Sequence, residues 1–425
     1  MLDIKLIRTE TDFVKKALDR RGYGHAVDDL IDLDENRRKL IAQVEDLKAE
    51  RNKASEEIAR VKKDKGDAAP IIARMKSVSD QIKELDQQVK DADAALLERI
   101  GELPNLPHDS VPDGKGDEDN VEIERSGEPP VLDFEPKPHW DLANDLGMVD
   151  FERGTKLAGS GFILYKGAGA RLERALISFM LDMHITHHGY TEVWPPYLAL
   201  PSIMYGTGKL PKFKDDMYWV SEDDLYLNPT AEVPITCIHM EEILPPGTLP
   251  VKYTGYCASF RREAGAAGKD TRGLIRIHQF DKVEMVQLTE PDKSYEALEE
   301  MLQQAKNVVE ALGLTYRILN CCAGDIGQAA SKMYDVEIWA PGLGKWLEVS
   351  SVSNCTDYQA RRANIRFRTE AQGKPEFAHT LNGSGIALPR TVIAILENYQ
   401  QPDGSVVIPP VLRPYMGGME RISNT

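Results

Sequence analysis

Two long stripes of apolar residues limit the possible folds of this chain more than any other feature. Each stripe advances in steps of three and four residues, the spacing that places side chains along one seam of a helix. The first stripe consists of Leu33, Leu40, Val44, Leu47, Ala54, Ile58 and Val61, and the second of Ile71, Met75, Val78, Ile82, Leu85, Val89, Ala92 and Leu96. Arg37 and Arg51 interrupt the first stripe, and Gly66 to Pro70 separates the two. Helices joined by so short a turn must fold back on each other, which predicts an antiparallel two-helix coiled coil.

The predicted hairpin forms an arm that projects from its surroundings. A first helix from about Val27 to Lys65 would be on the order of 50–60 Å long. Such an arm has little core beyond its seam, so we expect it to reach a large partner. Seven lysines and arginines lie between Lys48 and Lys65 against four acids, within a chain of net charge −16. That local excess fits a solvated helix face or a contact with a polyanion, whereas the net charge argues against unspecific nucleic-acid binding by the whole surface.

The composition changes after the hairpin. Seven prolines and the acidic run 117–119 fall between Glu102 and Pro138 and indicate a linker with an irregular lead-in. We therefore expect an N-terminal domain with the helical arm over 1–103, the linker over 104–138 and a mixed domain over 139–425.

Strand-like runs outnumber helices in the last of these segments. Helices are expected over about 170–188 and 293–312. The strand candidates are 190–194, 225–227, 255–261, 275–288, 316–319, 333–339, 346–355 and 377–380. This order predicts the α+β class, with a largely antiparallel sheet flanked by helices.

The lack of long apolar runs and the spacing of the cysteines indicate the cell compartment in which we expect this protein. No run of about 18 apolar residues occurs, and the first residues carry acids without an apolar stretch, so neither a membrane span nor a secretory signal is expected. Of the five cysteines only Cys321 and Cys322 lie close together, and no CxxC pair exists. This argues against a disulfide framework or a cysteine-based zinc site and favours a cytoplasmic location.

Two segments of the second half carry fixed cations where a polyphosphate could bind. In 255–286, Arg261 and Arg276 flank a glycine-rich loop between two strand-like runs. In 381–400, the small residues NGSG are expected to form a turn that leads straight into a helix, with Arg390 near its start. The motif GxxxxGK[ST] is absent, so these segments predict an ATP site without a P-loop.

These segments resemble the motifs of a known enzyme family. Phe260-Arg261-Arg262-Glu263 with the returning run 276–280 resembles motif 2 of the class II aminoacyl-tRNA synthetases, 382–390 resembles motif 3, and the helix leading into 190–196 resembles motif 1. The class I signatures are missing. The runs Thr230-Ala231-Glu232, RGLIRIHQFDKVE at 272–284 and Glu348-Val349-Ser350-Ser351 extend the likeness to bacterial-type seryl-tRNA synthetases over essentially the whole chain.

The resemblance implies a role for each residue of the ATP site. Arg261 would bridge the amino acid carboxylate and the α-phosphate, while Arg390, assisted by Arg276, would contact the γ-phosphate. Phe280 would stack on adenine and Glu263 would accept from its amino group. Glu348 and Ser351 would bind Mg²⁺ through hard oxygen atoms. The implied ATP-binding set is Arg261, Arg262, Glu263, Arg276, Phe280, Glu348, Val349, Ser350, Ser351 and Arg390, of which Arg261, Arg390 and Glu348 would be catalytic.

The same resemblance implies a serine pocket. Glu232 with Thr230 would bind the ammonium group, and Glu284 with Ser384 would bind the hydroxyl group. The full implied set is Thr230, Ala231, Glu232, Arg261, Glu284, Asn382 and Ser384. A pocket that hydrogen-bonds a hydroxyl group rejects alanine, because its buried polar groups would be left unpaired. Taken alone, Glu284 could be an exposed strand residue, since it alternates with Val283 and Met285.

The implied function is an ATP-dependent ligase. It would convert L-serine and ATP to seryl-adenylate and pyrophosphate, and then transfer serine to the 3′-terminal adenosine of serine tRNA held by the arm. Selenocysteine tRNA stays open as a second acceptor, and a homodimer through motif 1, without DNA or membrane partners, is expected from the resemblance. The alternatives are a non-catalytic synthetase-like RNA-binding protein, a relative that loads carrier proteins, and threonyl or prolyl specificity.

Overall fold

The computed structural model describes residues 1–264 and 272–424. The chain forms two compact units, Leu2–Pro104 and Asn105–Thr425, the latter together with Met1. Within the described residues, no helix has both the length and the apolar character that crossing a membrane requires.

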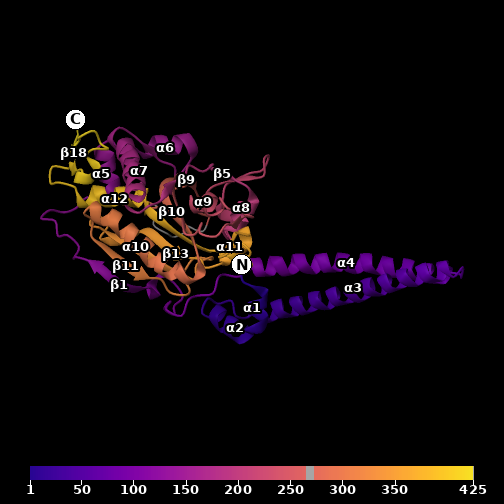
Figure 1. The fold of residues 1–425 in the computed structure, drawn as a ribbon. Helices are drawn as coiled ribbons and strands as arrows, with labels where there is room; N and C mark the ends of the chain where they lie inside the picture. Colours follow the sequence, from indigo (N-terminus) through magenta and orange to yellow (C-terminus); the bar gives the residue numbers. More distant parts are fainter. Residues whose placement is uncertain (265–271, 425) are drawn as a thin grey trace. The chain divides into compact units, whose positions relative to one another are not determined.

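The first unit is helical, and its two long helices form the predicted antiparallel hairpin (Figure 1). Every residue of both apolar stripes is buried or partly buried along the seam. Pro70 stands in the first turn of the second long helix, where its missing N–H group has no intrahelical partner to lose. The helices are α1 (Ile4–Thr9), α2 (Thr11–Asp19), α3 (Ala26–Lys63) and α4 (Ala69–Glu102).

Charged residues at the edges of the seam pair across the two helices. Arg37, which interrupts the first stripe, pairs with Asp93, and Lys48 Nζ lies 3.1 Å from Asp86 Oδ1. Partly exposed ion pairs of this kind each contribute only about 0.2–1 kcal/mol to the free energy of unfolding. The apolar seam therefore supplies most of the stability of the hairpin, and the ion pairs favour its register.

An eight-stranded sheet forms the centre of the second unit (Figure 1). The strand order is β1-β11-β12-β13-β16-β10-β9-β4, and every neighbouring pair is antiparallel except β4 and β9. The predicted α+β class with a largely antiparallel sheet is thus confirmed. The strands are β1 (Val121–Ser126), β4 (Thr191–Glu192), β9 (Val251–Phe260), β10 (Gln279–Thr289), β11 (Tyr316–Asn320), β12 (Lys332–Ala340), β13 (Lys345–Asn354) and β16 (His379–Ala387).

Three helices contribute to the apolar core on one face of this sheet. They are α7 (Ala168–His187), α10 (Ser294–Ala311) and α12 (Leu388–Asn398), and their buried side chains join those of Val283 and Met285 from β10. Because side chains alternate along a strand, Glu284, which lies between these two residues, points to the opposite face. That opposite face carries the polar site.

The segment NGSG lies inside strand β16, which corrects the expectation of a turn. Helix α12 begins only at Leu388. A Cβ atom on Gly385 would lie 2.6 Å from His184 Nε2 of α7, and one on Gly383 would lie 3.1 Å from Met301 Sδ of α10. The small residues are required because these helices approach the strand closely, so they mark tight packing and not a turn.

Other segments differ from the expected boundaries. The long run 275–288 becomes a strand only from Gln279 onward. Within 104–138, residues Val121–Ser126 form the edge strand β1, paired with β11. The run Leu225–Leu227 forms β7, which belongs to a separate three-stranded sheet with β5 (Leu198–Ala199) and β6 (Trp219–Val220).

Candidate active site

Two cavities share Arg261 in their walls. The larger has a volume of about 330 Å³ and is lined mainly by residues of β10 and β13, the run 274–277 before β10 and the start of α12. The smaller has a volume of about 210 Å³ and is bordered by Lys209, Pro229 and Thr230. The guanidinium group of Arg261 can therefore face ligands in both cavities.

Backbone and side-chain contacts fix Arg261 at the end of β9. Its backbone N–H donates to the carbonyl oxygen of His278, which aligns it with the returning strand. Its Nε atom donates to Pro229 O at 3.2 Å, and its guanidinium carbon lies 5.0 Å from the centre of the Phe280 ring. The cation–π contact and the hydrogen bond together hold the guanidinium group of Arg261 in one place.

Of the two residues that follow Arg261, one lines the larger cavity and the other lies outside both cavities. Glu263 lines the larger cavity and pairs there with Arg276. The side chain of Arg262 is exposed and lines neither of the two cavities, and its backbone N–H donates to Asp216 O at 2.8 Å. The loop that follows, 265–271, lies outside the described residues.

A β-bulge in β13 aligns the predicted metal-binding pair. Glu337 opposes Glu348 while Val336 opposes Ser350, so Val349 is an extra residue in the strand. A bulge changes the alternation of side chains. As a result Glu348 and Ser351 both line the larger cavity, together with Val349. Ser350 is buried instead and donates from Oγ to Ser384 O at 2.7 Å.

A second bulge precedes helix α12. Lys282 opposes Ala387 while Glu284 opposes Ser384, and Ile386 adopts a φ of +89°, which is rare for a β-branched residue. The chain then enters α12, whose first turn carries Arg390. The Nη1 atom of Arg390 donates to Glu348 O at 2.6 Å and to Glu348 Oε2 at 3.1 Å.

Two buried carboxylates lie close to the smaller cavity. Glu284 Oε2 lies 2.5 Å from Lys282 Nζ and accepts from Thr230 Oγ1 at 3.2 Å. Glu232 Oε2 lies 2.9 Å from Lys209 Nζ. The other oxygen of Glu232 accepts from Gln359 Nε2 at 2.9 Å and from Asn382 Nδ2 at 3.4 Å.

The pKa values of these two carboxyl groups are shifted in opposite directions. Burial raises the pKa of Glu284, and nearby Glu232 adds to the effect, while Lys282 opposes it only in part. Burial also acts on Glu232, but Lys209 and Lys282, helped by the hydrogen bond from Gln359, outweigh it and lower the pKa. The cations therefore keep Glu232 firmly anionic and leave Glu284 easier to protonate.

The structure brings together most of the residues expected from the sequence. Arg261, Glu263, Arg276, Phe280, Glu348, Val349, Ser351, Ser384 and Arg390 line the larger cavity, and Thr230 and Arg261 line the smaller one. Ala231 is fully buried at the start of α9 (Glu232–Thr236). Glu284 lies behind the cavity walls, in contact with Lys282 and Thr230, which border the cavities. Asn382 lies farther back and contacts Glu232, which borders neither cavity.

Three residues of this site were missed by sequence reasoning. Lys282 stands two residues before Glu284, so alternation along the strand could have placed both on one face. Lys209 and Gln359 reach Glu232 from segments distant in the sequence. No local signal marks them, because only the tertiary fold brings them to the carboxylate.

The chain matches two family models. The first, described as "Seryl-tRNA synthetase N-terminal domain", matches residues 1–107. The second, described as "tRNA synthetase class II core domain (G, H, P, S and T)", matches residues 218–399. The second match spans the strands and loops that line the larger cavity.

Individual relatives match the chain over its whole length. The serine–tRNA ligase of Geobacillus thermodenitrificans is 56% identical over 423 residues, which is 99% of this chain and 100% of that protein. The crystal structure of seryl-tRNA synthetase from Pyrococcus horikoshii complexed with ATP has a TM-score of 0.95 at 40% identity and covers 100% of both chains. The crystal structure of cytoplasmic serine–tRNA ligase from Naegleria fowleri in complex with AMP has a TM-score of 0.89 at 30% identity, covering 100% of this chain and 99% of that one.

The alternative of a non-catalytic RNA-binding protein finds no support in these comparisons. Identity of this extent over 99% of this chain, together with a class II core model that includes the residues lining the larger cavity, decides the assignment. The chain therefore belongs to the serine–tRNA ligases, a family of class II aminoacyl-tRNA synthetases.

Proposed function

We propose that the two cavities perform serine activation together, with ATP in the larger and serine where the two cavities meet. The observation that carries this proposal is the position of Arg261, which borders both. A guanidinium group at that junction can hold the carboxylate of serine against the α-phosphate of ATP. Attack of the carboxylate oxygen on that phosphorus then gives seryl-adenylate and releases pyrophosphate. Positioning and charge neutralisation are sufficient for this step, so no protein nucleophile is required.

In the larger cavity, two arginines that now form ion pairs with glutamates would bind the triphosphate of ATP instead. Arg276 pairs with Glu263, and Arg390 with Glu348. Phosphate oxygens accept the same N–H groups with more charge, so ATP can compete for both guanidinium groups. Glu263 is then available to the adenine amino group, while Phe280 offers a ring face to the base. A relative whose structure is described as complexed with ATP supports ATP as the ligand.

Mg²⁺ fits the same cavity. The bulge in β13 sets the carboxylate of Glu348 and the hydroxyl group of Ser351 along one wall, and both supply the hard oxygen ligands that Mg²⁺ prefers. When bound there, Mg²⁺ would neutralise charge on the phosphates. We assign these two residues, and no others, to the ion.

Serine selection is assigned to the buried carboxylates. Glu284 and Ser384 would hydrogen-bond the hydroxyl group of serine, with Thr230 bonded to Glu284. Glu232, kept anionic by its neighbours, would bind the ammonium group of serine while its carboxylate also pairs with Lys209. Alanine would leave a buried carboxylate without its hydroxyl partner, and this unpaired group would lower the affinity of the pocket for alanine.

The remaining assignments extend the proposal to the partners of the chain. The helical arm would bind serine tRNA, as the match of its domain to the seryl-tRNA synthetase N-terminal model suggests. The 3′-terminal adenosine would then take the serine from the adenylate, and selenocysteine tRNA stays open as a second acceptor. We also propose a homodimer and a cytoplasmic location, the latter supported by five cysteines that are all free.

Substitution of Arg261 tests the proposal against a matched neighbour. Arg261→Ala removes the only cation proposed to bridge the two substrates, so serine-dependent exchange of pyrophosphate into ATP should fall by at least about 100-fold. Arg262→Ala removes an adjacent, exposed guanidinium group outside both cavities and should stay within about threefold of the parent. Equal losses in the two variants, or normal exchange in Arg261→Ala, would refute the bridging role.

A further inference from the structure

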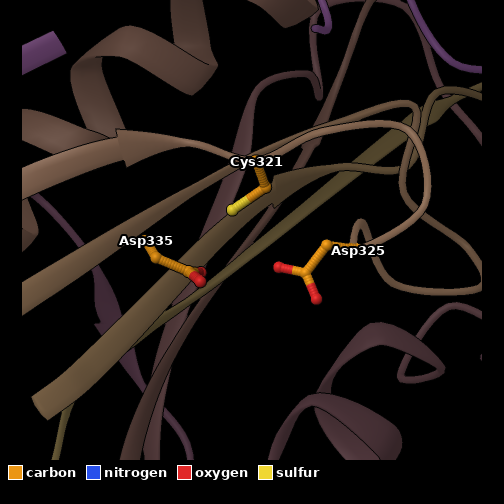
Figure 2. Close-up of side chains that lie close together, drawn as sticks. All are labelled: Cys321, Asp325 and Asp335. Atoms are coloured by element: carbon orange, nitrogen blue, oxygen red, sulfur yellow. The ribbon is translucent and has the colours of Figure 1, made fainter. Parts of the chain in front are cut away.

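Three potential metal ligands converge beside the sheet, in a place that the proposed reaction does not use. Cys321 follows β11 directly, Asp325 lies in the turn after it, and Asp335 is part of β12. One ligand atom from each residue lies within 4.8 Å of the other two. Figure 2 shows the thiol and the two carboxylates turned toward a common point.

Asp335 is buried with one carboxylate oxygen unpaired. The residue is 8% exposed, and its Oδ1 atom is buried and has no hydrogen-bond partner. In the described part of the chain, neither Asp335 nor Asp325 forms an ion pair with a lysine or arginine. A carboxylate in this setting carries a large desolvation cost, which a bound cation would remove.

The charged groups around Asp335 are acids. Burial raises the pKa of its carboxyl group well above the ordinary range, and Glu348, Asp325 and Glu337 add to the effect, while the thiol of Cys321 offsets a part. Burial likewise raises the pKa of the Cys321 thiol. A bound cation would offset the negative charge that these acids bring together.

The backbone and neighbouring side chains hold the three ligands in position. Cys321 N donates to Met333 O at 3.1 Å, which continues the pairing of β11 and β12. Asn120 Nδ2 donates to Asp325 Oδ2 at 2.8 Å, and Asn120 Oδ1 accepts from Cys322 N at 2.8 Å. Hydrogen bonds of this kind, made by residues behind the ligands, orient metal-binding side chains in proteins.

We propose that Cys321, Asp325 and Asp335 bind a divalent transition-metal ion of the Zn²⁺ type, separate from the Mg²⁺ assigned to ATP. A thiolate with two carboxylates suits a borderline-soft ion, whereas Mg²⁺ prefers oxygen ligands alone. Ligand atoms on one tetrahedral Zn²⁺ lie about 3.5 Å apart, given bonds of about 2.0–2.3 Å. A small inward movement of the three side chains therefore closes the site, with the remaining position open to water.

The position of the site links it to the ATP cavity. Asp335 pairs directly with Ser351 across β12 and β13, so their side chains share one face of the sheet. Glu348 lies near enough to influence both Asp335 and Cys321. A bound ion would thus tie the end of β11 to β12 and reduce the negative charge beside the cavity.

Binding of Co²⁺ tests the proposal, because a thiolate bound to this ion gives a charge-transfer band in the near ultraviolet. The full chain is reduced, freed of metal and titrated with Co²⁺ in the absence of ATP and serine, so the result does not depend on the proposed function. We expect the band to saturate at about one ion per chain. Cys321→Ser should abolish the band, whereas Cys322→Ser should keep it, because Cys322 Sγ donates to Gly116 O at 3.3 Å and takes no part in the cluster.

A second measurement guards against variants that fail to fold. Zn²⁺ should raise the melting temperature of the parent and of Cys322→Ser, since an ion that binds only the folded state stabilises it, and should leave Asp335→Asn unchanged. A band that persists in Cys321→Ser, a band lost equally in Cys322→Ser, or a parent without any band would overturn the proposal. The last result would leave the three residues as a cluster that shares protons.

Discussion

At the scale of single residues, Lys282 is the neighbour that most favours the ionised form of Glu284. Lys282 is its ion-pair partner at 2.5 Å, while burial and nearby Glu232 favour the protonated form. Only the ionised carboxylate can both pair with Lys282 and accept freely from the hydroxyl group of serine. Serine binding should therefore weaken as the pH falls through the raised pKa of Glu284.

Replacing Lys282 tests this dependence. Lys282→Met removes a group that lowers the pKa of Glu284, so the pH at which the KM for serine begins to rise should move upward. The measurement is the pH profile of KM for serine and for ATP in pyrophosphate exchange, and the profile for serine should change more. Lys252→Met is the matched control, because Lys252 also forms an ion pair, with Glu300 at 2.7 Å, away from both cavities. An unchanged inflection in Lys282→Met would exclude this role.

At the scale of elements, close packing against β16 explains its glycines. A Cβ atom at Gly385 would lie 2.6 Å from the ring of His184, which is fully buried and bonded to His188 at 2.9 Å. A Cβ atom at Gly383 would lie 3.1 Å from Met301 Sδ and 3.2 Å from Cγ2 of the β-branched Val352. The two positions therefore differ in how far their neighbours must move.

This difference predicts unequal costs in stability. Gly385→Ala should lower the free energy of unfolding by about 1–3 kcal/mol, because a buried ring must shift. Gly383→Ala should cost less, because Met301 and Val352, at 3.1 and 3.2 Å, need to move less than the His184 ring at 2.6 Å. Chemical denaturation of both variants measures the two values, and an equal or reversed order would contradict the packing account.

Elements with a local signal were predictable from the sequence. The hairpin was visible because the stripes repeat along one helix face, and the first long helix, Ala26–Lys63, begins and ends within about two residues of the predicted bounds. The strand conformation of NGSG was not predictable, because its glycines are required by close contacts with α7 and α10 and not by the neighbouring sequence. The cluster of Cys321, Asp325 and Asp335 was not predicted either: the cysteine spacing argued against a cysteine-based zinc site, and Asp335 reaches Cys321 only through the pairing of β11 with β12.

At the scale of the whole molecule, the chain assigns its two proposed tasks to separate units. The cavities lie entirely within Asn105–Thr425, while the arm belongs to Leu2–Pro104. Serine activation requires only the cavities, and recognition of tRNA is proposed for the arm. The two activities should therefore be separable.

Shortening the arm tests this division. Removal of roughly residues 35–95 should leave pyrophosphate exchange within about threefold of the parent and reduce charging of serine tRNA by at least about 100-fold, because the cavities are untouched and the tRNA contact is lost. Both assays are run on one preparation, so that loss of folding would appear in the exchange rate. Efficient charging by the shortened chain would exclude the proposed role of the arm.

The central claim is that the paired cavities activate serine and no other amino acid. Pyrophosphate exchange into ATP, measured with each of the twenty amino acids in turn, tests it most directly. We predict exchange with serine and a far slower rate with alanine, because alanine lacks the hydroxyl group that Glu284 and Ser384 are proposed to bind. Exchange supported equally by another amino acid, or no exchange at all from folded protein with Mg²⁺ present, would contradict the claim.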